Sequence, residues 1–474
     1  MIYTYLISCT VYTLLYLIGV YIILEILQYV NNIIWGFPML MLIIGTGVFL
    51  TIRLRFLQLR KLLYAHRLIF AKDNSRDSSR DSSKRNSVKG DISQFQALTT
   101  ALAATLGTGN IAGVATAIYF GGAGALFWMW ISGFIGMATK YSEAILAVKF
   151  RVIDERGNIS GGPMYYIEKG LGIKWLGILF CVFGSLAAFG IGNMVQSNSV
   201  AAVINSTYNI SPWITGVILM LITSIVILGG IQGIGKVTAI LVPIMALSYT
   251  IGGVIVIAVN YMLVPVAFQA IIDGAFSGMA ITGGALGSAI RFGVARGVFS
   301  NEAGIGSSAI AAAAARTDYP AKQALVSMTQ TFIDTIIICT ITGFAILTSG
   351  ALGNGLTGAA LTTSAFQMAL PGFGAHIVSI GLVLFAYSTI LGWCYYGEKC
   401  IEYLMGRTII PLYRALFLLA VFYGAILRLD LVWAFADIMN GLMAIPNLIA
   451  LIFLSNVVIS ETNRFFFKND ILKK

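Results

Sequence analysis

The polar sequence Gly-Thr-Gly-Asn at residues 107–110 interrupts an apolar stretch that runs from about residue 95 to residue 130. A glycine in a helix interior costs roughly 1 kcal/mol relative to alanine, so glycines on both sides of a threonine favour an opening in the helix. In a lipid bilayer an opened helix is tolerated only where its freed backbone groups line a cavity or find partners in the protein. The meaning of the interruption therefore depends on whether the chain lies in lipid.

Composition answers this question. Apolar residues make up 58% of the chain and charged residues only 10%, with a mean hydropathy of +0.88, whereas soluble proteins carry about 25% charged residues. The chain is therefore predicted to be a multi-pass membrane protein. The formal net charge of +11 does not by itself indicate nucleic-acid binding, because cytoplasmic loops of membrane proteins collect Lys and Arg. The two histidines, and five cysteines without metal or disulfide spacing, offer little for a zinc site or for catalysis.

Apolar runs and basic loops divide the chain into successive parts. We expect an apolar N-terminal extension over 1–30, an extra transmembrane helix with a basic cytoplasmic end over 31–70, a polar cytoplasmic linker over 71–94, a first five-helix repeat over 95–260, an external hairpin region over 261–284, a second five-helix repeat over 285–457 and a cytoplasmic tail over 458–474. The extension is an extra span, an interfacial segment or an addition from an upstream start codon. The positive-inside rule places the C-terminus in the cytoplasm of a cell-membrane protein.

The sixth span of the predicted core is also interrupted. It runs over about 289–315 and contains the sequence FSNEAG at 299–304. The interrupted spans are therefore the first and the sixth, which are corresponding positions of two five-span halves. Matching interruptions in two halves mark the binding site of an inverted-repeat transporter. The predicted fold class is an all-α polytopic membrane protein with an inverted repeat of five plus five helices, one extra N-terminal span and room for a second.

The opened backbone at the first interruption offers binding groups of two kinds. The N-terminus of a half-helix presents free N–H groups that suit a carboxylate, whereas freed carbonyl oxygens suit a cation. Thr108 lies at the centre of this segment, between Gly107 and Gly109. The alternative is a helix-packing motif of small residues, because Gly109 and Gly113 are four positions apart.

The second interruption contains a charged residue. Glu302 follows Ser300 and Asn301 and precedes Gly304. A carboxylate at membrane depth costs about 2.5 to 3.5 kcal/mol, so Glu302 should have a partner, and Arg296 is the nearest candidate. We favour a structural ion pair over direct contact between Glu302 and a transported cation.

Three further spans carry polar residues on one face. Asp334 in the seventh core span lies on a stripe that we expect to face the bundle interior. The other residues of that stripe are Gln323, Ser327 and Gln330. Asp334 is interpreted as a cation ligand, a titrating group or, as we favour, an anchor for the broken helix. In the third span Phe189 and Gln196 share a face that forms either interhelical contacts or a pocket wall.

The eighth core span carries the adjacent hydroxyls of Ser388 and Thr389, and Trp393 follows Thr389 by one helical turn. Hydroxyl and carbonyl oxygens suit sodium. In membrane helices, serine and threonine also commonly bond a carbonyl of their own preceding turn. Lys140 and Glu143 near the inner end of the second core span are interpreted as a neutralising pair, because they are three positions apart.

Six motifs in the same order resemble the alanine or glycine:cation symporter family of bacteria and archaea. They are GTGNIAGVATA at 107–117, FWMW at 127–130, GMATKYSEA at 136–144, GGPMYYIEKGL at 161–171, RGVFSNEAGIGS at 296–307 and AYSTILGW at 386–393. The resemblance covers nearly all of residues 30–462. Family members usually have one proline where this chain has Ala123 and another within the stretch occupied here by Ser308 and Ala309, so the local helix geometry is expected to differ there.

The resemblance implies a leucine-transporter fold and a secondary active transporter that imports alanine or glycine with sodium by alternating access. The alternative is a proton-coupled or broader small neutral amino-acid symporter. The residues expected to bind the substrate are Gly107, Thr108, Gly109, Asn110, Phe189, Gln196, Ser300, Asn301, Gly304 and Trp393. Those expected to bind sodium are Thr105, Gly109, Ser388 and Thr389. Phe189 and Trp393 would cap a pocket that admits only small side chains.

Two other classes of protein fit the sequence less well. A channel is expected to carry rings of like residues from symmetric subunits, whereas this chain holds an asymmetric pair of broken helices. An intramembrane enzyme needs a nucleophile paired with a base, and no such pair is evident. The expected partners are a small neutral amino acid, sodium and membrane lipid, without nucleic acid or another cofactor. We expect a functional monomer, although the sequence leaves the oligomeric state open.

Overall fold

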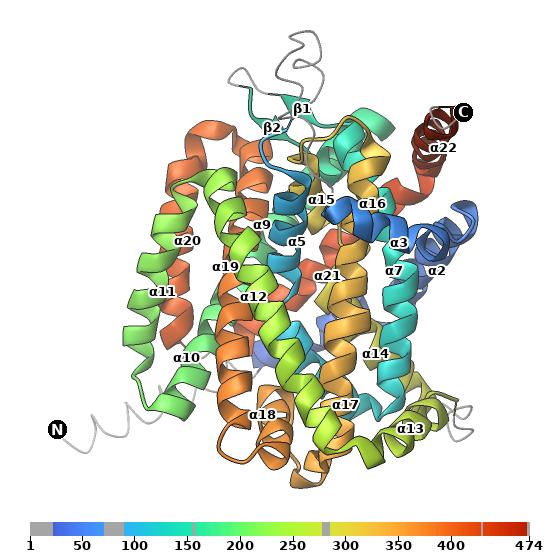
Figure 1. The fold of residues 1–474 in the computed structure, drawn as a ribbon. Coiled ribbons are helices and arrows are strands. Elements are labelled where there is room, and N and C mark those ends of the chain that lie inside the picture. Colours follow the sequence, from blue (N-terminus) through green and yellow to red (C-terminus); the bar gives the residue numbers. More distant parts are fainter. Residues whose placement is uncertain (1–21, 71–89, 154–156, 277–284, 428–429, 472–474) are drawn as a thin grey trace, which may run out of the picture.

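The long apolar runs fold into helices that stand side by side in one bundle (Figure 1). The computed structural model describes residues 22–70, 90–153, 157–276, 285–427 and 430–471. Expectations for residues 1–21, 71–89 and 277–284, which belong to the extension, the linker and the external hairpin, lie outside this part. Within the described ranges seven helices are long and apolar enough to span a bilayer, and a bent pair forms an eighth. The prediction of an all-α, multi-pass membrane protein is confirmed.

The described elements follow one another in chain order. The first part comprises α2 (Phe37–Arg53), α3 (Leu57–Ile69), α5 (Gln94–Thr105), η2 (Gly109–Gly113), α6 (Val114–Gly121), α7 (Gly124–Lys149), β1 (Val152–Ile153), β2 (Ile159–Ser160), α8 (Pro163–Tyr166), η3 (Ile167–Leu171), α9 (Lys174–Phe189), η4 (Gly190–Met194), α10 (Val195–Tyr208), α11 (Pro212–Ile227) and α12 (Gly230–Val259). The second part comprises η5 (Tyr261–Leu263), α13 (Val264–Phe276), α14 (Ala285–Asn301), α15 (Ser307–Ala313), α16 (Pro320–Thr331), η7 (Phe332–Cys339), α17 (Thr340–Ser349), η8 (Ala351–Asn354), α18 (Gly358–Ala369), α19 (Gly374–Met405), η9 (Arg407–Ile409), α20 (Ile410–Ile426), α21 (Asp430–Phe453) and α22 (Ser455–Ile471). Residues 22–34 form a further helix before α2.

The first predicted interruption is a break in the helix. α5 and the helix that follows it are bent by 52°, and Leu106 at the bend has extended backbone angles. A Cβ atom on Gly107 would lie 2.7 Å from Thr389 Oγ1. Glycine at this position therefore lets the opened segment approach α19 closely.

The second predicted interruption is also a break. α14 ends at Asn301 and α15 begins at Ser307. Between them Gly304 and Gly306 have φ angles of 91° and 90°, which glycine adopts without steric cost. Glu302 has a φ of 56°, an uncommon value for a residue with a Cβ atom. The chain therefore changes direction inside the sixth core span.

Two other spans widen locally beside these breaks. η4 joins α9 to α10, and η7 joins α16 to α17, and both are π-helical. Single π-helical turns within long helices are frequent at functional sites. Hydrophobic periodicity does not reveal such a turn, because it averages over several helical turns.

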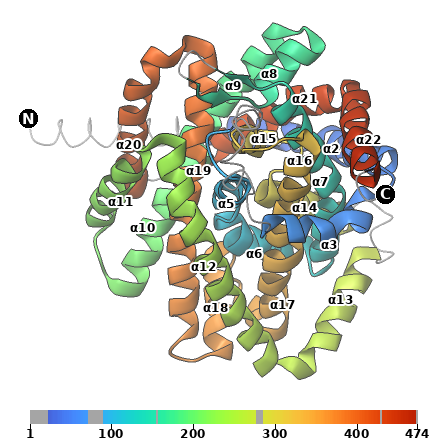
Figure 2. The same cartoon turned by 45° about the horizontal axis from the view of Figure 1, so that its top comes forward.

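The breaks lie in the middle of the bundle. α5 contacts α12, α15 and α19, and α7 contacts α14 and α16, so the first break is surrounded by other helices (Figure 2). The two broken spans touch each other, since a Cβ atom on Gly109 would lie 3.2 Å from Ser300 Cα. Backbone groups freed by both breaks therefore face protein neighbours, as the membrane environment demands.

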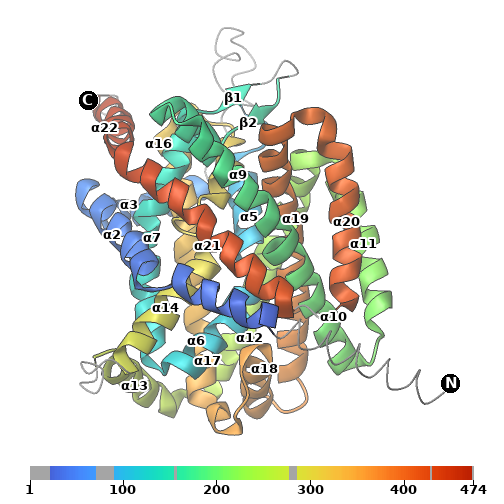
Figure 3. The ribbon, with the colours of Figure 1, turned by 180° about the vertical axis from the view of Figure 1, so that it is seen from behind.

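The basic segments gather at one end of the bundle. α3 contacts α7 and α16 there, and α22 and the hairpin of β1 and β2 lie at the same end, whereas α13 and α18 lie at the other (Figure 1). Seen from behind, the helix at 22–34 and α2 run beside α14 and α21 (Figure 3). Trp35 Nε1 donates to Asp437 O across this contact at 3.1 Å. The division into two five-helix repeats stays a prediction.

Candidate substrate and cation site

A cluster of oxygen atoms joins the first break to α19. Ser388 Oγ lies 3.1 Å from Ala103 O and 2.8 Å from Phe385 O. Thr389 Oγ1 lies 3.1 and 2.9 Å from the same two carbonyl oxygens. Leu106 O lies 3.5 and 3.3 Å from the hydroxyls of Ser388 and Thr389. Two hydroxyl protons thus face three buried carbonyl oxygens, a surplus of acceptors that suits a hard cation.

The four residues predicted to bind sodium divide into two pairs. Ser388 and Thr389 belong to the oxygen cluster. The Thr105 hydroxyl instead lies 3.1 Å from Ala101 O and accepts from Gln330 Nε2 at 3.3 Å, and Gly109 lies against α14. The carbonyls that the first broken span gives to the cluster come from residue 103 in the last turn of α5 and from residue 106 at the bend, while Phe385 O belongs to α19 itself.

Asp334 connects both breaks through neutral donors. Its carboxylate accepts from Asn110 Nδ2 at 2.8 Å, from Ser300 Oγ at 2.9 Å and from Thr335 Oγ1 at 2.8 Å. Asn110 lies in the first break, and Ser300 lies in the last turn of α14. Asp334 is fully buried, and no Lys, Arg or His of the described residues forms an ion pair with it. These hydrogen bonds offset the cost of burying the carboxylate, a geometry that suits the anchoring role favoured from the sequence.

Gln196 lies beside the first break, and one of its two side-chain polar atoms has no hydrogen-bond partner. Its Nε2 donates to Thr108 Oγ1 at 3.3 Å and to Ile191 O at 3.0 Å. Its Oε1 is buried without a hydrogen-bond partner, and a Cβ atom on Gly107 would lie 3.6 Å from it. Burying an acceptor without a donor is costly, so this oxygen is suited to accept from a ligand's ammonium group.

The two aromatic residues expected to cap one pocket lie in different places. Trp393 packs against Gly192 in η4, and its side chain lies near the Glu302 carboxylate. Phe189 instead packs against rings of α20, with 5.5 Å between its ring centroid and that of Tyr413. Trp393 is therefore next to the second break, whereas Phe189 faces away from both breaks.

Buried charges of α7 hold the second break. Lys140 Nζ donates to Glu302 O at 2.9 Å and to Ser308 Oγ at 2.6 Å. Glu143 Oε1 accepts from Gly304 N at 2.9 Å, and Glu143 Oε2 lies 3.8 Å from Lys140 Nζ. A cation therefore contacts a freed carbonyl and an anion contacts a freed N–H group, which matches the polarity of an opened helix.

Asn447 of α21 completes the support of the second break. Its Nδ2 donates to Glu143 Oε1 at 2.7 Å and to Gly304 O at 2.9 Å, and its Oδ1 accepts from Tyr166. Sequence reasoning missed Asn447 and also Thr335, which accepts from Asn301 and donates to Asp334. The available signal for Asn447 was an amide directly after Pro446 inside an apolar span.

The expected ion pair between Arg296 and Glu302 is wrong. The Glu302 carboxylate accepts from Ser307 Oγ, and no ion pair joins it to Arg296, both being described residues. The Arg296 guanidinium lies 5.5 Å from the centroid of the Phe299 ring and lines a cavity of about 190 Å³ with Asp437. The reason is geometric, because six positions along a helix lead to a different face and α14 ends just before Glu302.

The remaining predicted polar residues lie in the interior. Asn301 Nδ2 donates to Thr335 Oγ1 at 2.9 Å, and Asn301 Oδ1 accepts from Ala303 N at 2.9 Å, so its amide stabilises the turn after α14. The stripe of Asp334, Gln323, Ser327 and Gln330 is buried, which confirms that it faces the bundle interior. The structure thus gathers the segment 107–110, Gln196 and Ser300 around one place.

Comparison with known proteins identifies the family. A model described as the sodium:alanine symporter family matches residues 20–473. The sodium/alanine symporter AgcS of Methanococcus maripaludis is 54% identical over 452 residues, which cover 94% of this chain and 97% of that protein. The probable sodium/glutamine symporter GlnT of Bacillus subtilis is 38% identical over 430 residues, covering 90% of this chain and 87% of that protein.

Solved structures agree on the fold. The structure of MhsT in complex with L-phenylalanine superposes with a TM-score of 0.54 at 13% identity, covering 79% of this chain and 98% of that chain. At this identity the likeness shows the fold alone, and it confirms the predicted leucine-transporter fold. With the family match over nearly the whole chain, the protein belongs to the sodium:alanine symporter family and is an amino-acid:cation symporter.

Proposed function

We propose that this protein imports alanine or glycine together with sodium by alternating access. The observation that carries the proposal is the oxygen cluster in which Ser388 and Thr389 of α19 meet carbonyl oxygens of the first break. A sodium ion at this cluster would bridge two separate spans. Ion binding would then favour the arrangement in which α5 and α19 are close, which is how a ligand shifts a conformational equilibrium.

The substrate is proposed to bind on the other side of the same backbone segment. Its carboxylate would face the opened backbone of residues 107–110, and its ammonium group would face Gln196 Oε1, which has no other partner. Trp393 beside Glu302 would limit the room for a side chain. Because ion and substrate use one segment, each stabilises the geometry that the other needs, which makes their binding mutually favourable.

The inward sodium gradient would set the direction of transport, and the orientation of the protein is part of the proposal. The basic end of the bundle, with α3 and α22, is placed in the cytoplasm of a cell-membrane protein by the positive-inside rule. The relatives' names include alanine and glutamine, so the substrate range is the part of the proposal that needs direct measurement.

Uptake into liposomes tests this function. Purified protein is reconstituted, and uptake of labelled alanine, glycine and glutamine is measured with an inward sodium gradient or with a proton gradient alone. We expect sodium-driven uptake of alanine or glycine. Uptake driven by protons alone would instead support a proton-coupled symporter. A preference for glutamine would support a symporter for a broader range of neutral amino acids.

Substitution of the cluster tests its role as the ion site. Ser388→Ala and Thr389→Ala are expected to raise the sodium concentration for half-maximal uptake about tenfold each, equivalent to a loss of about 1.4 kcal/mol of ion binding. Ser248→Ala is the matched control, because this hydroxyl bonds only Met245 O of its own helix. If all three variants keep the wild-type sodium dependence, the ion site is elsewhere.

A further inference from the structure

A basic pocket lies where the turn between α2 and α3 meets α22. Its volume is about 550 Å³, and four cationic side chains line it together with Thr462 and Asn463. The four cations are those of Arg53, Arg55, Arg60 and Lys61. We define these six residues as the basic pocket. It lies at the basic end of the bundle, away from the two breaks.

The cations of the basic pocket have only neutral partners in the described part of the chain. Arg53 donates to Ser455 Oγ at 2.7 Å and to Asn456 Oδ1 at 2.8 Å, and Arg60 donates to Leu54 O. Lys61 Nζ lies 4.8 Å from the centroid of the Phe466 ring. The nearby carboxylate of residue 461 is bound by Lys149 at 2.6 Å. Four positive charges therefore converge on one cavity without an acidic side chain lining it.

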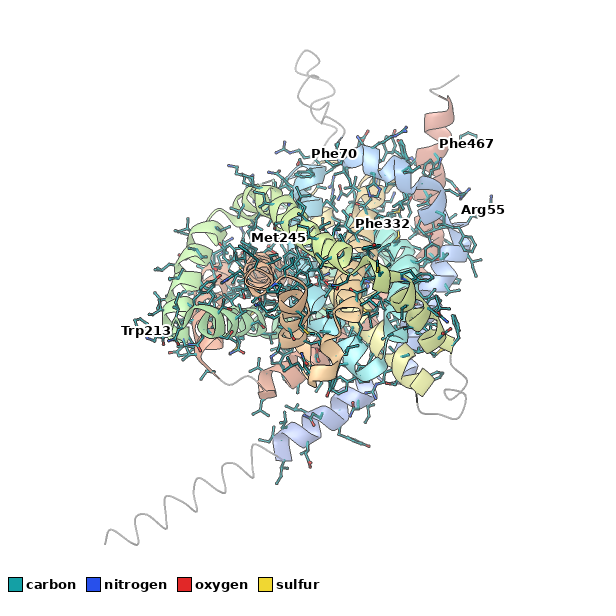
Figure 4. All side chains as sticks on the ribbon, turned by 60° about the horizontal axis from the view of Figure 1, so that its bottom comes forward. Arg55, Phe70, Trp213, Met245, Phe332 and Phe467 are labelled. Carbon is teal, nitrogen blue, oxygen red and sulfur yellow. The ribbon has the colours of Figure 1, made fainter. Side chains whose placement is uncertain are left out.

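The backbone of this turn is unusual. Arg55 and Phe56 are consecutive non-glycine residues with φ angles of 54° each, values that are uncommon for residues with a Cβ atom. The turn sends α3 across the ends of α7 and α16 instead of continuing the direction of α2. Arg55 in this turn and Phe467 on α22 lie at the rim of the molecule (Figure 4).

Exposed apolar side chains lie on the two helices, α3 and α22, that line the basic pocket. Leu59 and Leu63 on α3 are 63% and 81% exposed, and Phe467 on α22 is 74% exposed. Amphipathic helices with exposed apolar side chains typically lie at a membrane interface, where those side chains contact the acyl chains of lipids. A ligand of this region therefore meets positive charge and apolar surface together.

We propose that the basic pocket binds the headgroup of an anionic phospholipid whose acyl chains lie against Leu59, Leu63 and Phe467. Arginine fits a phosphate through paired hydrogen bonds, and basic pockets between helices on the cytoplasmic side are suited to anionic headgroups. A free phosphate would use the same cations but would leave the apolar rim uncovered. This inference goes beyond the proposed transport function and rests only on the proposed orientation of the basic end.

Native mass spectrometry of the full-length protein in neutral detergent tests the proposal. Phosphatidylglycerol is titrated against phosphatidylcholine with the same acyl chains, and inorganic phosphate is added as a competitor. The pocket variant is Arg55→Gln with Lys61→Gln. The matched control is Lys169→Gln with Lys236→Gln, which removes two exposed positive charges at the same end outside the pocket.

We expect the wild type and the control to retain phosphatidylglycerol at about one tenth of the concentration needed for phosphatidylcholine, and the pocket variant to lose this preference to within about twofold. Gel filtration and thermal melting of each variant verify that it is folded. Equal losses in both double variants, equal retention of the two lipids by the wild type, or displacement of the lipid by millimolar inorganic phosphate would each overturn the proposal.

Discussion

The two breaks that face each other in the centre of this protein are held by different chemistry. The first break is held by uncharged donors, namely the hydroxyls of α19 and the amide of Asn110, which donates to the buried Asp334 carboxylate. The second break is held by a buried lysine and a buried glutamate of α7. Hydrogen bonds between uncharged groups contribute only about 0.5 to 1.5 kcal/mol each, whereas removing one partner of a buried charged pair costs about 3 to 5 kcal/mol. We infer that the first break changes its geometry when ligands bind, whereas the second break keeps its geometry.

The largest effect is expected from breaking the charged support of the second break. Lys140→Met leaves Glu143 buried without its cation, which should destabilise the protein by about 3 to 5 kcal/mol and abolish uptake. The measurement is the melting temperature of the purified protein in detergent, together with alanine uptake by liposomes.

A double variant controls this prediction. In Lys140→Met with Glu143→Gln the uncompensated charge is gone, while the glutamine retains an oxygen for Gly304 N. The double variant should therefore melt closer to the wild type than Lys140→Met does. If it melts at the same temperature as Lys140→Met, the charge pair is not what stabilises the second break.

A somewhat smaller effect is expected from changing Asp334, whose carboxylate accepts hydrogen bonds from residues of both broken spans. Asp334→Asn retains the size of the side chain but offers one acceptor oxygen to the donors Asn110, Ser300 and Thr335. Loss of about 2 kcal/mol of charge-assisted hydrogen bonding should lower the uptake rate roughly 30-fold. Asp273→Asn, at an exposed position of α13, is the control and should transport normally. Equal rates for both variants would show that Asp334 does not link the breaks.

An intermediate effect is expected from filling the close contact at the first break. A Cβ atom on Gly107 would meet Thr389 Oγ1 at 2.7 Å, whereas nothing lies within 4 Å of a Cβ atom on Gly113. Gly107→Ala should therefore raise the sodium concentration for half-maximal uptake about tenfold, as expected for a shift of about 1.4 kcal/mol. Gly113→Ala should not change it. A strong effect of Gly113→Ala would favour the interpretation of this segment as a helix-packing motif.

The smallest effect is expected at Phe189. Its ring packs against α20 and not against the breaks, so Phe189→Leu should leave the alanine concentration for half-maximal uptake within about twofold of wild type. Gln196→Ala, which removes the unpartnered oxygen beside Gly107, should raise that concentration about tenfold, a loss of about 1.4 kcal/mol. A rise of about tenfold for Phe189→Leu and no change for Gln196→Ala would instead indicate that Phe189 lines the substrate pocket.

Much of the candidate site was predictable because it depends on local chemistry. Both breaks lie where glycines weaken an apolar helix, and the stripe of Asp334 faces the interior because polar side chains avoid lipid. The Arg296 prediction failed because nearness in sequence says little about direction at a helix end. Phe189 and Trp393 do not cap one pocket in the structure. Phe189 packs against rings of α20, whereas Trp393 packs against Gly192 of η4.

By itself the sequence determined that the chain spans a membrane, where two of its helices open and which residue types surround the openings. Only the tertiary structure decided that Ala103 and Leu106 supply carbonyl oxygens to Ser388 and Thr389, and that Lys140 and Glu143 hold the second break. The physical reason is that an opening follows from the conformational cost of local residues, whereas the partner of a freed backbone group depends on which distant helix packs against it.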